Sequence, residues 1–135
     1  MLLVIDAALS DADVLEPLQN LMNTRSIRDV RPHEIVKDDR VPVLLRELLS
    51  PTFITIDEAG FWHRHLCSDV YCILCFALSD AQQELIPSLL RKLLRLPEFK
   101  TKANRMGKVA RISLANIKYY QAGDNKLHVL AWSKK

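Results

Sequence analysis

Two short apolar segments that each end in an aspartate constrain the fold of this chain more than any other feature. Leu2–Ile5 is followed by Asp6, and 52–56, which is rich in β-branched and aromatic residues, is followed by Asp57. Such runs are typical of strands that are buried on both faces, as in a parallel sheet. Because parallel strands end at one edge of a sheet, the pattern predicts both carboxylates at that edge.

Segments with helical periodicity separate the predicted strands. Apolar residues recur at helical spacing over 12–23, 41–49 and 81–96, and a shorter helix is expected over 97–105. Further strands are expected over 26–30, 70–78, 109–114 and 127–132, with 123–125 as the turn of a C-terminal hairpin. This order predicts an α/β fold in which helices flank a mainly parallel sheet with an antiparallel C-terminal hairpin.

Length and composition indicate one globular domain spanning 1–135. The chain is 49% hydrophobic and 26% charged, which excludes the disordered class. Asp6 interrupts the apolar start before a signal peptide or membrane span could form, so we expect no membrane association. The three cysteines lie within nine residues, as expected for reduced thiols in a cytoplasmic protein. We expect a monomer or a small homodimer.

Two further acids complete a candidate metal site. Asp38 and Asp39 precede the helix predicted over 41–49, on the same edge of the sheet as Asp6 and Asp57 if the crossovers are right-handed. Clustered carboxylates repel one another unless a hard cation holds them together, and Mg²⁺ or Mn²⁺ in such a site suits attack of water on a phosphodiester. The alternative is that each aspartate only caps a helix or forms a turn.

Basic residues concentrate in the last third of the chain. The net charge of +3 is too mild to mark a nucleic-acid binder, but eight bases oppose only Glu98 over 91–111. The first of these bases suit the end of the helix over 81–96. The run continues beyond that helix, which predicts phosphate contacts from four residues: Lys100, Lys102, Arg105 and Lys108.

The cysteines and histidines also permit a zinc interpretation. Cys72 and Cys75 have the spacing of a zinc knuckle, and His63 and His65 lie nearby in the sequence. If both cysteines lie on one strand, however, their side chains point to opposite faces and cannot share a metal. We therefore interpret them as buried small hydrophobic residues.

Three segments carry a resemblance to a known family. The segments are 4–10 (VIDAALS), 38–41 (DDRV) and 55–61 (TIDEAGF), and the strand over 108–112 (KVARI) is also similar. Together they resemble the PIN-like family, in its short branch of toxin-like and uncharacterised proteins. The resemblance follows the chain in order over nearly its whole length.

The resemblance implies a three-layer α/β/α sandwich and, in active members, a Mg²⁺- or Mn²⁺-dependent ribonuclease. Asp6 matches the first acid of the family pattern, Asp39 or Asp38 the acid at the helix entry, and Asp57 the acid after the third strand. The resemblance assigns catalysis to Asp6, Asp39 and Asp57, and metal binding to these three residues together with Asp38 and Glu58. RNA is the implied substrate, and an antitoxin protein the partner if the chain is a toxin.

One departure from the family pattern separates two hypotheses about function. The second acid of the usual acid-x-acid-Phe pattern is missing, since Ala59 and Gly60 precede Phe61. An enzyme needs another ligand from Glu58, Asp69 or Asp38. A catalytically degenerate domain that binds nucleic acid or another protein needs none.

Overall fold

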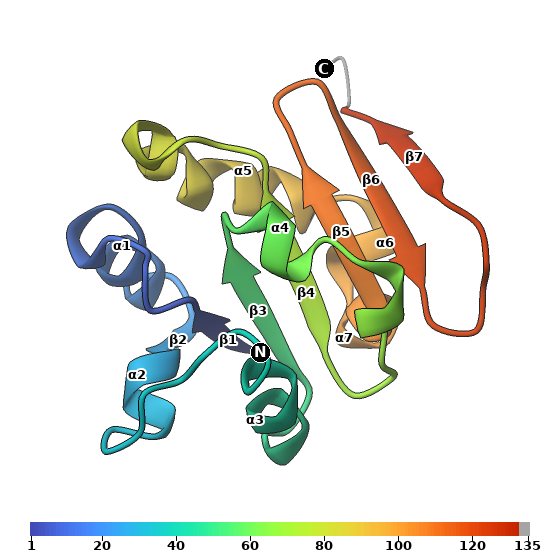
Figure 1. Ribbon diagram of the computed structural model, residues 1–135. Helices are drawn as coiled ribbons and strands as arrows, with labels where there is room; N and C mark the ends of the chain where they lie inside the picture. The colour runs from blue at the N-terminus through green and yellow to red at the C-terminus, as the bar shows by residue number, and fades with distance from the viewer. Residues whose placement is uncertain (133–135) are drawn as a thin grey trace.

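The computed structural model describes residues 1–132 and contains one seven-stranded sheet (Figure 1). The strands lie in the order β2-β1-β3-β4-β5-β6-β7. Their bounds are β1 (Leu2–Ile5), β2 (Asn23–Ser26), β3 (Pro51–Thr55), β4 (Cys72–Phe76), β5 (Lys108–Ile112), β6 (Asn116–Gln121) and β7 (His128–Ala131).

Strands β1 to β5 are parallel, and β6 and β7 continue the sheet in antiparallel fashion. Helices cover both faces, which gives the three layers of an α/β/α sandwich. The predicted fold class is therefore confirmed. The apolar strand β4 lies in the middle of the sheet, as its composition predicted.

One helical layer lies in front of the sheet in Figure 1 and contains α2 (Ile27–Val30), α3 (Val41–Glu47), α4 (Glu58–Phe61) and the 3₁₀ turn η2 (Arg64–Leu66). We call the sheet surface beneath it the front face. The other layer contains the π-helical turn η1 (Asp11–Leu15), α1 (Glu16–Gln19), the 3₁₀ helix η3 (Asp80–Leu85), α5 (Ile86–Leu93), α6 (Pro97–Lys100) and α7 (Lys102–Arg105).

Each face of the sheet has its own hydrophobic core. Strand residues alternate between the two, so that Val4, Phe53 and Ile73 pack in the front core whereas Ile5, Ile54 and Leu74 pack behind. Cys72 and Cys75 lie in different cores, as their spacing on one strand predicted. No helix within residues 1–132 is long and apolar enough to cross a membrane.

The prediction for the second strand was wrong. The segment predicted as a strand over 26–30 is mostly the helix α2, and β2 precedes it. The Ser26 side chain accepts a hydrogen bond from the Arg28 amide and caps α2. Ile27 and Val30 lie three positions apart, so a single helical turn buries both.

The other differences concern helix lengths and the end of the sheet. Proline occupies the first turn of α1, α3 and α5, and the predicted helices over 12–23 and 81–96 each begin as another helix type. Helix α3 ends at Glu47, which leaves Leu49 exposed. Strand β6 was not predicted, and it separates the two strands expected to form the terminal hairpin.

Candidate functional site

Strands β1 and β3 place Asp6 and Asp57 at neighbouring strand ends, and Thr55 joins them. The amide of Asp6 donates to the carbonyl of Ile54 at 2.9 Å, which continues the β1–β3 pairing. The Thr55 hydroxyl donates to Asp6 Oδ2 at 2.7 Å and accepts from the Asp57 amide at 3.0 Å. One side chain thus fixes both acids at the carboxyl edge of the sheet, as their positions after apolar strands predicted.

Asp57 also caps helix α4, and this brings a glycine into the site. Its Oδ1 accepts from the Gly60 amide at 3.0 Å. A Cβ on Gly60 would lie 2.6 Å from Oδ2 of Asp57 and 2.6 Å from Oδ2 of Asp38. Such contacts are far below van der Waals distance, so only glycine allows the two carboxylates to approach the backbone of α4 this closely.

Asp38 reaches the same cluster from the loop before α3. Partial burial raises the pKa of Asp38, and a hydrogen bond to Asp57 and the charges of Asp57, Asp6 and Asp39 raise it further. These causes require the carboxylates to lie near one another. The structure therefore brings Asp6, Asp38 and Asp57 together from three separate parts of the chain, and we call these three residues the acid cluster.

Asp39 lies at the rim of this cluster, where it lines a cavity of about 420 Å³ together with Asp38, Gly60 and two histidines. The histidines, His63 and His65, stack with ring centroids 5.3 Å apart. The sequence left open whether Asp38 or Asp39 would occupy the helix-entry position. Asp38 is the one that shares Gly60 with Asp57.

Glu58, the next predicted ligand, is held by a base. Its Oε1 accepts from Nε of Arg111 on β5 at 2.5 Å, and both side chains are partly exposed. Asp69, which was considered as a replacement for the missing family acid, is exposed and precedes β4. It therefore lies toward the amino end of the parallel strands, away from the acid cluster.

The donors of the acid cluster suit a hard divalent cation, and Gly60 leaves a cradle between two of them that a side chain would fill. Within residues 1–132, however, no three histidine, cysteine or acidic side chains are set closely enough to hold a metal ion as they stand. Mutual repulsion between carboxylates explains such a spacing. Binding would have to draw the carboxylates inward.

Comparison of the chain with family models, curated proteins and solved structures gives a simple result. None of them matches.

The four bases predicted to contact phosphate do not form one surface. Arg105 and Lys108 are buried, with exposures of 3% and 7%. Arg105 donates to the carbonyls of Phe99 and Lys100 at 2.8 and 3.1 Å, and Lys108 donates to the carbonyl of Asn104. Only Lys100 and Lys102 remain exposed for the predicted contact with nucleic acid.

This basic segment also lies at the opposite end of the sheet from the acid cluster. Helix α7 precedes β5, and Lys102 lines a cavity with Met1, Leu2, Asn23 and Ser50, which lie at or beside the starts of β1, β2 and β3. Acids and predicted phosphate contacts are thus separated by the length of the strands.

Sequence reasoning missed several residues that build the site. Thr55 was assigned to a strand and to the segment that resembles the family, without a role in the site, and Gly60 only to a family pattern that it interrupts. Arg111 was counted in the basic run, 53 positions from the acid that it pairs with. The position of Thr55 beside the carboxyl end of β1 could have been foreseen from parallel pairing, whereas the contact between Glu58 and Arg111 had no local signal.

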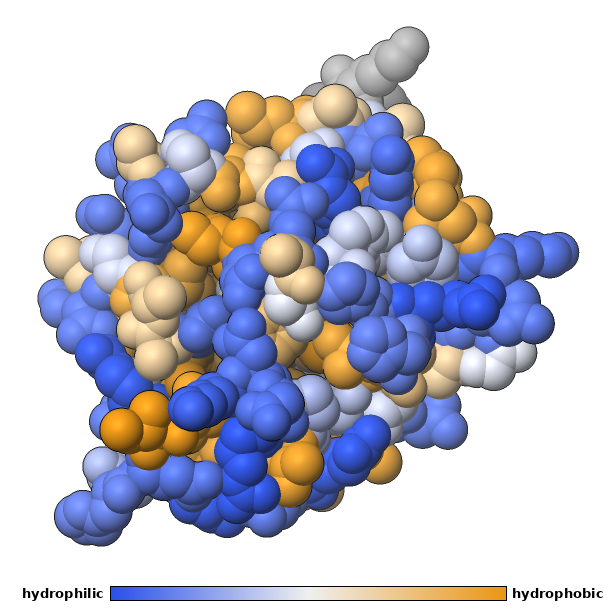
Figure 2. Space-filling model, viewed as in Figure 1, coloured by the Kyte–Doolittle hydropathy of each residue, from blue (hydrophilic) through white to orange (hydrophobic). Residues whose placement is uncertain are grey.

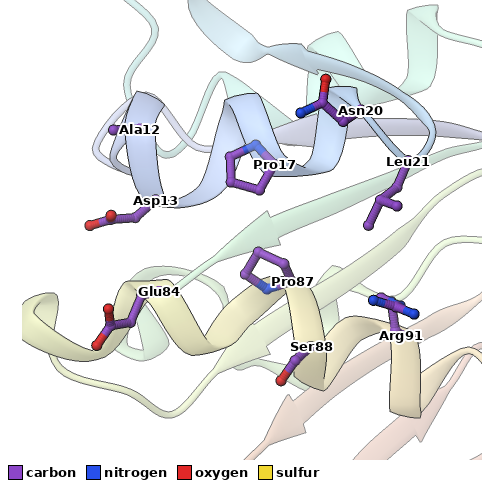
Figure 3. A pocket seen from close by; sticks show the side chains of 9 residues that line it. All are labelled: Ala12, Asp13, Pro17, Asn20, Leu21, Glu84, Pro87, Ser88 and Arg91. Atoms are coloured by element: carbon purple, nitrogen blue, oxygen red, sulfur yellow. The ribbon is translucent and has the colours of Figure 1, made fainter.

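Another cavity, of about 510 Å³, lies between η1–α1 and η3–α5 (Figure 3). Pro17 and Pro87 face each other across it, with Asp13 and Glu84 toward one end and Arg91 toward the other. These helices pack on the back face of the sheet, and the cavity contains none of the predicted site residues. It is therefore separate from the acid cluster.

Proposed function

We propose that this chain is a metal-dependent ribonuclease of the PIN-like type, with Asp6, Asp38 and Asp57 as ligands of Mg²⁺ or Mn²⁺. The convergence of these three carboxylates carries the proposal: Asp38 and Asp57 meet at Gly60, and Thr55 joins Asp6 to the Asp57 amide. The chemistry supplied by a bound divalent cation is activation of water and neutralisation of charge on a phosphodiester. As a toxin, the chain would act in the cytoplasm, where its three free thiols stay reduced, and would have an antitoxin protein as partner.

The residues around the cluster have distinct roles in this proposal. Thr55 orients Asp6 by its hydrogen bond to Oδ2, while Oδ1 accepts only a long hydrogen bond, 3.5 Å from the Ala8 amide. Asp57 is held by two backbone contacts, one at its own amide and one at the Gly60 amide. Asp39 lines the cavity beside the cluster and adds a further negative charge there. Such fixed ligands lower the cost of organising a metal site.

A second candidate function is supported by a specific observation. The carboxylates of the acid cluster are not close enough together, as they stand, to hold a cation, and Glu58 forms an ion pair with Arg111. Both facts favour a catalytically degenerate domain that binds nucleic acid or another protein. The two functions differ in one measurable property, which is the response of the folded protein to a divalent cation.

The test compares melting temperature and RNA cleavage with and without Mn²⁺ or Mg²⁺. A cation that binds only the folded state stabilises it by about 2.7 kcal/mol at a concentration of 100 Kd. The wild-type chain should show this gain and cleave single-stranded RNA. Asp6→Asn and Asp57→Asn should lose both properties, and asparagine at 57 keeps the helix cap. Asp69→Asn, which neutralises an exposed acid at the other end of the strands, is the matched control and should respond as wild type.

Two outcomes would separate the candidates. If the metal leaves wild-type melting unchanged and RNA survives, the ribonuclease is wrong and the binding module is the better account. If Asp69→Asn loses the response as fully as Asp6→Asn does, the metal is bound outside the acid cluster.

A further inference from the structure

A row of side chains crosses the front face of the sheet from the acid cluster to two bases. Strand pairing sets Thr55 beside Cys75, Cys75 beside Arg111, and Arg111 beside Lys118. Neighbouring strands lie about 4.8 Å apart, so Arg111 begins roughly 10 Å from Thr55. Figure 2 shows the molecular surface that covers this face, with hydrophilic residues interspersed with apolar ones across the middle of the view.

The pKa of the buried Cys75 thiol shows that acidic side chains lie close to this row. Burial raises the pKa of Cys75, and the charges of Glu58, Asp57 and Asp6 raise it further. These carboxylates therefore lie near one residue of the row, while Arg111 is its immediate neighbour on β5. Opposite charges face each other across a short distance on the same surface.

Arg111 has unused hydrogen-bonding capacity. Its Nε donates to Glu58, but neither terminal nitrogen has a hydrogen-bond partner among residues 1–132. The side chain is 30% exposed, so these nitrogens can be reached from solvent. A planar guanidinium with two free nitrogens is suited to a phosphate, whose oxygens accept two parallel hydrogen bonds.

Lys118 adds a second positive charge, and none of the ion pairs found among residues 1–132 includes it. It is paired directly with Arg111 across the β5–β6 ladder, so both side chains project from the same face. Like charges in this position destabilise a sheet. Glu58 offsets only one of the two charges, so an anion bound between Arg111 and Lys118 would relieve the remaining repulsion.

An aromatic pair lies beside these bases. Tyr120 is two positions after Lys118 on β6 and therefore shares its face. Trp62, which follows α4, stacks on Tyr120 with ring centroids 4.8 Å apart, and both rings are half-buried. Exposed aromatic surface next to basic residues is typical of sites for single-stranded nucleic acid.

We propose that Arg111 and Lys118 bind a phosphate of single-stranded RNA next to the acid cluster, and that Glu58 occupies Arg111 when RNA is absent. This inference rests on the proposed ribonuclease function and names the surface that holds its substrate. It assigns substrate binding to the carboxyl end of the strands, whereas the sequence pointed to Lys100 and Lys102 at the amino end.

The test measures binding of a labelled single-stranded RNA oligonucleotide to the full chain in chelator, where no metal-dependent cleavage occurs. Arg111→Gln and Lys118→Gln should each weaken binding about tenfold and reduce the slope of log K against log salt by about 0.7. Glu58→Gln should tighten binding several-fold, because it frees Arg111. Loss of folding cannot produce a gain in affinity, so this variant keeps the proposal testable even if Arg111→Gln is unstable.

Arg95 is an exposed base that follows α5 in the helical layer behind the sheet. Arg95→Gln is therefore the matched control and should bind as wild type. The inference is wrong if wild type does not bind RNA, or if Lys100→Gln and Lys102→Gln weaken binding while Arg111→Gln and Lys118→Gln do not. Unchanged affinity in Glu58→Gln would overturn the role of Glu58. If the expected binding changes occur but wild type never cleaves RNA in Mn²⁺, the phosphate site stands and the ribonuclease proposal fails.

Discussion

The two ends of the parallel strands carry charges of opposite sign that are organised in opposite ways. At the carboxyl end, Asp6 and Asp57, 51 positions apart in the sequence, share Thr55, and Asp38 and Asp57 share Gly60. At the amino end, bases only a few positions apart separate, two into the interior and two to the surface. The comparison teaches that sheet topology, and not closeness in sequence, decides which charged groups can act together.

The largest expected effect lies at the amino end, where Arg105 serves the fold. Arg105→Ala should lower the free energy of unfolding by about 3 kcal/mol, because it empties a buried volume and leaves the carbonyls of Phe99 and Lys100 without a donor. Lys102→Ala, on the same helix but exposed, should change it by less than about 0.5 kcal/mol. Urea denaturation measures both free energies of unfolding. Equal effects would contradict the view that Arg105 supports the fold while Lys102 does not.

The next effect concerns the close approach of carboxylates at Gly60. Gly60→Ala places a methyl group against Oδ2 of Asp38 and of Asp57, so it should push these carboxylates apart and remove most of the stabilisation of about 2.7 kcal/mol expected from Mn²⁺ at 100 Kd. Ala59→Ser, at the exposed neighbouring position of α4, should retain that metal response. Thermal melting with and without Mn²⁺ provides the measurement. A full metal response in Gly60→Ala would show that these two acids do not act on one cation.

Two buried threonines on β3 sharpen the comparison within a single strand. Thr55→Val removes the hydroxyl that joins Asp6 to the Asp57 amide, and should destabilise the protein by about 1–2 kcal/mol. Thr52 lies near the amino end of β3, and its hydroxyl has no partner among the described residues. Thr52→Val should therefore be neutral or stabilising. Chemical denaturation of both variants checks this, and a reversed order would contradict the role given to Thr55.

The smallest expected effect is the pH dependence of the metal-free protein. Because the folded state raises the pKa of Asp38, this group favours folding at low pH, and its contribution is lost as pH rises through the folded pKa. Asp38→Asn should thus stabilise the metal-free chain more at about pH 7 than at about pH 4, by under about 1 kcal/mol because the side chain is mostly exposed. Melting in chelator measures the difference, and a larger gain at the lower pH would show the opposite sign.

The parts of the fold that follow from hydrophobic pattern could be predicted. The apolar segments that form β1, β3 and β4 have to be buried inside the protein. The aspartates that follow β1 and β3 therefore had to lie at one edge of the sheet. Strand β6 was not predicted, although its buried positions, Ile117 and Tyr119, alternate with polar residues as in a half-buried strand. The pair Ile27 and Val30 fits either a strand or a helical turn until the cap at Ser26 decides between them.

The site was predicted only as far as residue type and strand position reach. Asp6 and Asp57 followed from the strand ends, and Asp38 or Asp39 from the helix entry. Burial of Arg105 and Lys108 could not be foreseen, because charged residues are almost always exposed and their carbonyl partners come from tertiary packing. Arg111 likewise gained its position beside Glu58 only when β5 joined the sheet next to β4.

Strand β4 carries a thiol into each of the two hydrophobic cores, and this arrangement has a kinetic consequence. Burial raises the pKa of Cys72 to about 12 and that of Cys75 further, so neither thiol reacts while its helical layer stays in place. Alkylation of each cysteine therefore reports how often the layer above it lifts away. Equal rates would mean that the sandwich opens as one unit, and a faster rate at Cys75 would mean that the layer over the acid cluster separates first.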